Sequence, residues 1–457
     1  MSTERVSLWM IGSLMLVGLC LVPTLQFGLL DWDDALHITA SQSAVSARDW
    51  LLTPKLGYPI PVTVASYALD HALFGALPLG FHLSQIVYQL LVCGLYFGLS
   101  RRIGLSHVGA ALALIVFALH PASAEPVSWV SGRKDVLCAL FGLAAVWFAL
   151  SPARSALAAS LLCYALALLS KPSAAPLAVF AVVLPHVLYP DRARVDRRSL
   201  VRAVSYGLVL LPIVVLGVRG QANVGALETS DETMSGAHAA WYALGHHLSV
   251  VFLWEEATAK YLPMWPPGFT PRVDLAPLMA AVIVAVALYC TRARPQLRRV
   301  VALGAAWSLL TYLPSSGVFF PLSRYLADSY VFLPLMGAGW IAGALLDSLR
   351  AATRAAVGVA WVCALALVPC FLISSARFAD DERLWSHALQ RFPHHRRVCR
   401  QWANGVARVR GPDAGLQATD SCIERFGPEL FVRNRAVLLG RLGRSDEAQA
   451  WLQAHPR

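Results

Sequence analysis

Long apolar runs repeat along the chain and stop near residue 375, and this feature leaves few folds available. Hydrophobic residues make up 57% of the 457 residues and charged residues only 14%, whereas soluble domains carry about 25% charged residues. Runs of this length are typical of segments that cross a bilayer. Since backbone groups in lipid must be hydrogen-bonded within the chain, each run predicts a helix. We therefore expect an all-α, polytopic membrane protein.

About eleven spanning helices are expected from hydropathy, with soft boundaries because several runs are short. The first run follows a short charged start and exceeds the apolar region of a signal peptide, so we interpret it as an uncleaved span. The expected spans are roughly 8–30, 80–100, 104–120, 136–152, 155–171, 174–190, 203–219, 273–291, 300–314, 329–347 and 355–375.

Arginine clusters fall in alternate connections between these spans, which sets an expected orientation. Because cytoplasmic loops are rich in Lys and Arg, the N-terminus is predicted to be cytoplasmic and the C-terminus to lie outside. Long outside loops are then expected at 31–79 and 220–272. One more span at 238–256 would place the cluster from Arg292 to Arg299 outside, so we interpret that apolar stretch as an interfacial or re-entrant helix.

The last part of the chain, 377–457, changes to a polar, helical pattern, so we divide the chain into a membrane domain at 1–376 and a tail. Leu384 to Pro393 and Leu439 to Pro456 have the spacing of tetratricopeptide helices. The tail holds at most two repeats, so it must pack on the membrane domain or bind a partner. If it lies outside the cytoplasm, Cys399 and Cys422 could form a disulfide.

Three carboxylates follow the first span, in the sequence Asp31-Trp32-Asp33-Asp34. Carboxylates beside a bilayer are costly unless they are solvated or functional. Adjacent carboxylates repel, so one can keep a raised pKa and act as a general base. The alternative is a solvated loop start that only marks the membrane edge, and the spacing alone favours that alternative.

A second group of charges lies in the loop after the third span. A guanidinium can bind phosphate through two hydrogen bonds and a neighbouring lysine adds charge, so Arg133 and Lys134 indicate an anion site. Glu125 and Asp135 could instead simply neutralise these two cations. The candidate residues of this loop are His120, Glu125, Arg133, Lys134 and Asp135.

Two further basic positions lie at the ends of expected spans. Lys171 precedes a proline, and a lysine at such a place usually extends to the interface. Arg324 and Tyr325 open a stretch in which Arg324 could pair with Asp328 along a helix, and aromatic residues are common at membrane interfaces. Local evidence therefore favours a structural role for each of these positions.

Other classes of site are disfavoured by the sequence. The arginine clusters lack interleaved aromatic residues, so nucleic-acid binding is not expected. The chain contains no CxxC pair, Walker motif, GxGxxG or HExxH. A carboxylate pair could hold Mg²⁺, but two ligands make a poor site without help, so no metal is assigned.

Taken in order, these segments resemble the GT-C membrane glycosyltransferases, above all the protein O-mannosyltransferases with transmembrane and tetratricopeptide-repeat parts and their bacterial relatives. The likeness covers most of the chain. Ser329 stands where the family pattern has a basic residue, and Arg324 could replace it. The segments that carry the resemblance are Asp33-Asp34, His120-Pro121 with Glu125, Gly132 to Leu137, Ser170-Lys171-Pro172, and Ala327 to Tyr330 with Leu333-Pro334.

The resemblance implies that Asp33 or Asp34 is the catalytic base, with the other orienting acceptor or sugar, and that transfer inverts the anomeric carbon. Nucleotide sugars are not available outside the cytoplasm, so we expect a sugar on a polyprenyl phosphate as the donor, with mannose or another hexose. Arg133, Lys134 and Arg324 are the expected phosphate ligands, and Lys171 is a weaker one.

The expected acceptor is a Ser or Thr hydroxyl of a protein that the tail docks, at the periplasmic face of a bacterial inner membrane. On this interpretation Asp33, Glu125, Arg133 and Arg324 line one cavity. Alternatives are a GT-C transferase that modifies a lipid or glycan, and a non-catalytic membrane scaffold that uses its tail. A transporter is disfavoured because the acidic residues lie at span ends rather than at the membrane midplane.

Overall fold

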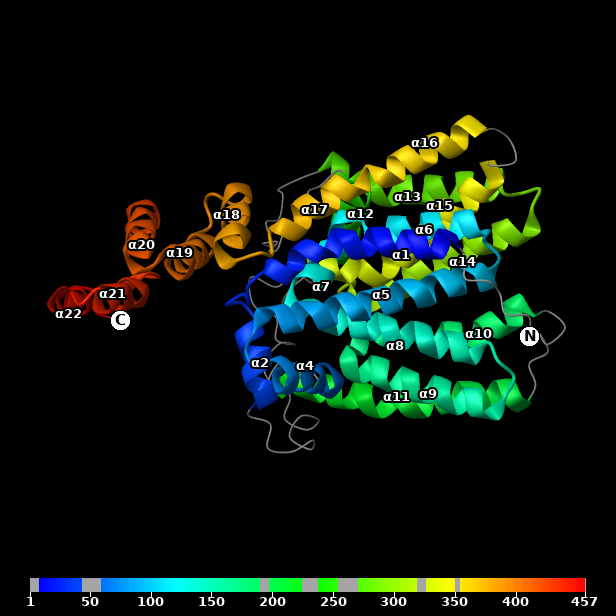
Figure 1. Cartoon of the computed structure of the whole chain (residues 1–457), viewed down its shortest axis with the longest axis horizontal. Coiled ribbons are helices and arrows are strands. Elements are labelled where there is room, and N and C mark those ends of the chain that lie inside the picture. Colours follow the sequence, from blue (N-terminus) through cyan, green and yellow to red (C-terminus); the bar gives the residue numbers. More distant parts are fainter. Residues whose placement is uncertain are drawn as a thin grey trace.

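A computed structural model of the chain describes residues 8–42, 59–189, 197–223, 237–253, 270–318, 326–349 and 354–456. These residues form α-helices and short 3-10 helices and contain no strand. Most of the helices run side by side in a bundle, and the C-terminal helices project from one end of it (Figure 1). The all-α architecture expected from the apolar runs is confirmed.

The membrane part contains helices that match the expected runs in order. Their bounds are α1 Leu8–Leu21, η1 Val22–Gln26, α2 Asp34–Gln42, α4 Pro61–Phe74, α5 Pro78–Ile103, α6 His107–Ala118, η2 Pro121–Ser123, α7 Ala124–Ser128, η3 Val130–Gly132, α8 Arg133–Ala149, α9 Arg154–Ser170, η4 Pro172–Ala174, α10 Leu177–Leu188, α11 Arg197–Asn223, α12 Ala237–Val251, α13 Pro271–Cys290, α14 Pro295–Tyr312, η6 Leu313–Ser315, η7 Asp328–Val331, α15 Phe332–Leu349, α16 Arg354–Leu365 and α17 Leu367–Ala376.

Six helical segments in the described part of the chain are long and apolar enough to cross a membrane, and a bent pair raises this number to seven. The protein is therefore a multi-pass membrane protein, while the count of about eleven spans stays a prediction. The bent pair consists of α6 and the segment Pro121–Ser128, which meet at 62°. The bend follows from Pro121, which cannot continue a helix from residue 120.

One end of the bundle collects the segments that the sequence analysis assigned to the outside. Helices α2, α4 and α7 lie at the end from which the C-terminal helices project (Figure 1). Helix α12 packs beside α13 and contacts η7. The sequence predicts that α12 is an interfacial or re-entrant helix, and its position in the bilayer stays a prediction.

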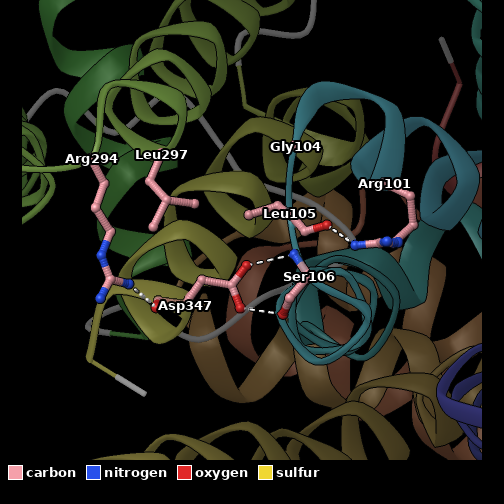
Figure 2. A pocket seen from close by; sticks show the side chains of 7 residues that line it. All are labelled: Arg101, Gly104, Leu105, Ser106, Arg294, Leu297 and Asp347. Carbon is pink, nitrogen blue, oxygen red and sulfur yellow. Dashed lines mark hydrogen bonds between the residues drawn. The ribbon is translucent and has the colours of Figure 1, made fainter. Parts of the chain in front are cut away.

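The other end of α5 carries a polar pocket of about 410 Å³ where the α5–α6 turn meets α15 (Figure 2). The Asp347 carboxylate accepts a hydrogen bond of 2.6 Å from the Ser106 backbone N–H and another from the Ser106 hydroxyl. Arg294 donates to the Asp347 carbonyl at 2.7 Å, at the C-terminal end of α15. Gly104 has a φ of +118°, a conformation that glycine adopts most easily in this turn. These groups satisfy one another, so we assign the pocket a structural role.

The C-terminal tail forms five helices joined by short turns: α18 Asp381–Arg391, α19 Arg396–Arg410, α20 Pro412–Phe426, α21 Val432–Arg441 and α22 Ser445–Ala454. Neighbouring helices pack in pairs, as the tetratricopeptide spacing predicts. Cys399 and Cys422 form a disulfide that joins α19 to α20, with Cα atoms 6.0 Å apart.

The tail packs on the membrane part through an apolar cluster, which is one of the two alternatives that its small size left open. In this cluster Leu30 and Trp129 meet Phe378, Leu384 and Trp385. The Trp32 ring stacks on Trp129 at a centroid distance of 4.9 Å and lies 5.4 Å from the Trp385 ring. The tail therefore covers the loop that carries the carboxylates after the first span.

Candidate active site

Asp34 is the first residue of α2 and is completely buried. One of its carboxylate oxygens accepts from the Leu30 backbone N–H at 2.9 Å, and the other accepts from the Ser131 backbone N–H at 2.9 Å and from the Ser131 hydroxyl. Burial raises the pKa of Asp34 to about 6, against the hydrogen bonds from Ser131 and Leu30, which lower it. Asp34 thus joins the start of α2 to the loop before α8.

His37 lies one turn further along α2 and completes this junction. Its Nδ1 is 2.9 Å from the Ser131 hydroxyl, and its ring stacks on Tyr67 of α4 at a centroid distance of 5.7 Å. Burial, together with the nearby Lys134 cation, lowers the pKa of His37 to about 3. The imidazole is therefore neutral at physiological pH, and it holds α2 against α4 and the 130–132 turn.

Asp33 precedes this buried junction and differs from Asp34 in its environment. It is partly exposed, and its carboxylate makes no hydrogen bond or ion pair within the described residues. Its backbone carbonyl accepts from the His37 N–H, which begins the helix. Asp33 is thus held in place by its backbone while its carboxylate stays available.

His120 and Glu125 begin the second candidate segment, and both are buried. His120 Nδ1 accepts from the Ala122 backbone N–H at 3.2 Å, which leaves Nε2 to donate to the Val251 carbonyl of α12 at 3.1 Å. Glu125 lies in the first turn of α7. His120 therefore connects the bend at Pro121 to α12, and its hydrogen bond to Val251 holds the two segments together.

Arg133 begins α8 and is fully buried in an ion pair. Its Nη1 is 2.5 Å from an oxygen of Asp70 in α4, and its Nη2 donates to the Phe81 carbonyl at 2.8 Å. The guanidinium also lies 4.6 Å from the centre of the Tyr67 ring. The expectation that Arg133 lines a cavity with Asp33 is therefore wrong, because its guanidinium is enclosed between α4 and α5. A guanidinium held in this way is not available to bind a phosphate.

Lys134 and Lys171 are the remaining cations of the predicted phosphate site. The Lys134 ammonium lies 5.7 Å from the centre of the Trp129 ring and forms no ion pair within the part of the chain described. The Lys171 ammonium is 2.5 Å from an oxygen of Asp135 and 5.6 Å from the centre of the Tyr330 ring. Of these two lysines, Lys134 is therefore the one that pairs with no carboxylate among the described residues.

Arg324 and Tyr325 lie outside the described residues. Immediately after them, Asp328 and Ser329 are buried in η7, next to α12. There the Ala327 backbone N–H donates to His247 of α12 at 3.3 Å, and His247 Nδ1 is 2.9 Å from the Tyr312 hydroxyl.

Two contributors to this region were missed in the sequence. Ser131 holds both Asp34 and His37, and no motif distinguished it from other serines. Asp70 is the partner of Arg133, and its only signal was an acidic residue in an otherwise apolar, amphipathic helix. Within the described residues, no group of three or more His, Cys, Asp or Glu side chains is placed to hold a metal ion.

Comparison with known proteins finds relatives that are similar to part of the chain. No protein-family model matches the chain. Protein O-mannosyl-transferase TMTC4 of Mus musculus is 37% identical over 97 residues, which cover 18% of this chain and 13% of that protein. Protein O-mannosyl-transferase F38B6.6 of Caenorhabditis elegans is 23% identical over 297 residues, or 61% of this chain and 40% of that protein. The chain thus matches less than half the length of these relatives.

One solved structure is also similar, the crystal structure of ArnT from Cupriavidus metallidurans bound to undecaprenyl phosphate. It has a TM-score of 0.47 and 16% sequence identity, and the match covers 95% of this chain and 81% of that one. The resemblance that the ordered motifs indicated is confirmed: the chain is similar to the protein O-mannosyl-transferases.

Proposed function

We propose that this protein transfers a hexose from a polyprenyl-phosphate donor to a hydroxyl group of a protein acceptor, on the non-cytoplasmic face of the membrane. The observation that carries the proposal is the contrast between Asp33 and Asp34. Asp34 is buried and accepts hydrogen bonds on both oxygens, whereas the neighbouring Asp33 keeps its carboxylate available. The names of the curated relatives support the same reaction.

In the proposed reaction, the Asp33 carboxylate accepts the proton of the acceptor hydroxyl. The hydroxyl oxygen forms a bond to the anomeric carbon, while the bond from that carbon to the phosphate oxygen breaks and the electron pair leaves with the polyprenyl phosphate. Lys134 stabilises the charge that grows on this phosphate, and the paired Lys171 contributes less. Attack opposite the leaving group inverts the anomeric carbon.

Buried polar atoms without partners around Asp33 support a hydroxyl-rich ligand. Within the described residues, His37 Nε2, Trp129 Nε1 and Asp135 Oδ2 have no hydrogen-bond partner. Buried polar atoms in native proteins are usually paired. The three residues belong to the segments that carry Asp33 and Lys134 or that pack on them, so a bound sugar phosphate would supply hydrogen-bond donors and acceptors to these atoms.

The location is also part of the proposal. The alternating arginine clusters favour a cytoplasmic N-terminus and a periplasmic tail in a bacterial inner membrane. The disulfide between Cys399 and Cys422 agrees with an oxidising compartment for the tail. The polyprenyl chain would keep the donor in the bilayer beside the loop that carries Asp33 and Asp34, which we call the diacidic loop.

Three matched carboxylate variants test this function: Asp31→Asn, Asp33→Asn and Asp34→Asn. Each removes one negative charge from the same short segment. We expect Asp33→Asn to abolish the hexose-sized mass addition on envelope proteins while the protein still inserts and accumulates. Asp34→Asn should reduce thermal stability as well as activity, because it alters the buried junction, and Asp31→Asn, which loses the ion pair with Arg408, should reduce transfer far less than Asp33→Asn.

The same experiment separates the enzyme from a scaffold. If Asp33→Asn leaves every glycan unchanged in mass and amount, the carboxylate is not the base and the proposed mechanism fails. A scaffold would keep its partners in all three variants, and deletion of the whole gene would then change no glycan.

A further inference from the structure

A groove of about 520 Å³ lies between α19 and α21 of the tail and reaches the diacidic loop. Its wall on α19 contains Asn404, Ala407 and Arg408, and its wall on α21 contains Arg433, Asn434, Val437, Leu438 and Arg441. Asp31 also lines it, two residues before the proposed base. The groove therefore reaches from the tail to the loop that carries the proposed base.

We propose that this groove binds the acceptor as an extended polypeptide segment that carries acidic side chains, and that it presents a Ser or Thr of this segment to Asp33. The inference rests on the proposed function and adds the class of acceptor and the site that selects it.

The first support is a pair of uncompensated cations. Arg433 and Arg441 both lie on α21 and both line the groove. Both are exposed, and neither forms an ion pair within the described residues. By contrast, Arg410 pairs with Glu382 and Arg435 with Asp420. The groove therefore carries two positive charges that no carboxylate of the described residues pairs with.

The second support is the polar and apolar lining between these arginines. Asn434 Nδ2 donates to Asn404 Oδ1 at 2.5 Å, across the groove from α21 to α19. An asparagine amide offers donors and an acceptor, which suit the C=O and N–H groups of an extended backbone. Val437 lies between the two arginines and is 54% exposed, which leaves an apolar surface for a side chain of the occupant.

The third support is the physical link between groove and catalytic loop. Arg408 lies 3.3 Å from an oxygen of Asp31 and 2.8 Å from an oxygen of Asp381. The Asp31 backbone N–H also donates to Asp381 at 2.9 Å. These contacts fix the end of the groove to the loop that carries Asp33. Because Asp31 is already paired with Arg408, it does not oppose an acidic occupant further along.

Two fluorescent Ser/Thr peptides of equal length, one flanked by Glu and one by Lys, would test the groove on the full-length protein in nanodiscs. Fluorescence anisotropy without donor measures binding alone. We expect the Glu-flanked peptide to bind about tenfold more tightly, with a preference that weakens at high salt. The double variant R433E/R441E should reverse the preference, so that the Lys-flanked peptide binds more tightly.

A charge-matched control distinguishes the groove from the general charge of the tail. Arg396→Glu changes the same charge as Arg433→Glu at an exposed position on α19 that does not line the groove. We expect Arg433→Glu to weaken binding of the Glu-flanked peptide about fivefold and Arg396→Glu to change it less than twofold. In transfer assays the Arg433 effect should appear in KM rather than kcat.

The outcomes separate this inference from the proposed function. If Asp33→Asn abolishes transfer but R433E/R441E keeps the wild-type peptide preference, the acceptor groove is refuted and the enzyme remains. If Asp33→Asn leaves transfer intact, the proposed function fails whatever the peptides do. Equal effects of Arg396→Glu and Arg433→Glu would also overturn the groove, since the charge of the tail would then act without a defined site.

Discussion

The buried ion pair between Arg133 and Asp70 leads to a prediction that separates structural from catalytic cations. Arg133 is 0% exposed and Asp70 is 1% exposed. Removing one partner of such a pair leaves the other charge buried without compensation, which costs about 3–5 kcal/mol. Asp70→Asn should lie near the lower figure, since Arg133 keeps its hydrogen bond to the Phe81 carbonyl. Arg133→Met should lie in the same range, because Asp70 keeps the hydrogen bond from the Ser84 hydroxyl.

The double variant Arg133→Met with Asp70→Leu should recover most of this loss, because two apolar side chains of similar size can replace a buried pair at little cost. The assay is reversible unfolding in mixed detergent micelles, with the free energy of unfolding determined for each single and double variant. The coupling energy between the two positions then follows from the double-mutant cycle.

Lys134→Met is the matched control, since it removes the next cation along the same helix. Lys134 has no ion pair within the described residues, so its loss should change the free energy of unfolding by less than about 1 kcal/mol. It should nevertheless weaken binding of a polyprenyl phosphate. The reasoning would be refuted if Arg133→Met kept wild-type stability and lost donor binding, because Arg133 would then be a phosphate ligand.

Two further predictions concern the junction at α2 and the tail. Burial and the Lys134 cation lower the pKa of His37 to about 3 in the folded protein. The unfolded chain therefore binds a proton at a higher pH than the folded chain does. The stability that depends on the neutral ring is then lost as the pH falls through 6.5 toward 3. Between pH 7 and pH 5 the free energy of unfolding of His37→Gln should therefore rise by about 2 kcal/mol relative to wild type, and a constant difference would contradict this. Cys399→Ser opens a disulfide with a sequence separation of 23 residues and should lower tail stability by about 3 kcal/mol. Hydrogen exchange in α19 and α20 measures this loss, and unchanged exchange would contradict it.

The helices were predictable because lipid leaves the backbone few alternatives. Each expected span coincides with a helix, and the 104–120 run ends where Pro121 bends the chain. The number of spans was harder to predict, since α9 and α10 are apolar but short. The length and composition of such a helix do not determine whether it crosses the bilayer.

The candidate site was predictable only as a set of segments. Asp33-Asp34 and the loop before α8 do meet, and Ser131 joins them. The alternative of charge pairing within this loop was argued between neighbours in sequence, and it does not hold for Arg133 and Asp135. Arg133 and Asp135 lie on different faces of α8, so each finds its partner on another helix, at Asp70 and Lys171. Such long-range partners depend on the packing of α4 and α9, which no local pattern shows.

Trp32 stacks on Trp129 of the membrane part and lies at a tilt against Trp385 of the tail, so both parts of the chain hold the diacidic loop in place. A protein cut after Ala376 would expose the face of Trp32 that Trp385 covers and would remove the Asp381 carboxylate that binds the Asp31 backbone. The tail is therefore part of the support of this loop. On the proposed function, changes in the tail that suit a new acceptor must also preserve one wall of the loop that carries Asp33, so acceptor choice and chemistry would evolve together.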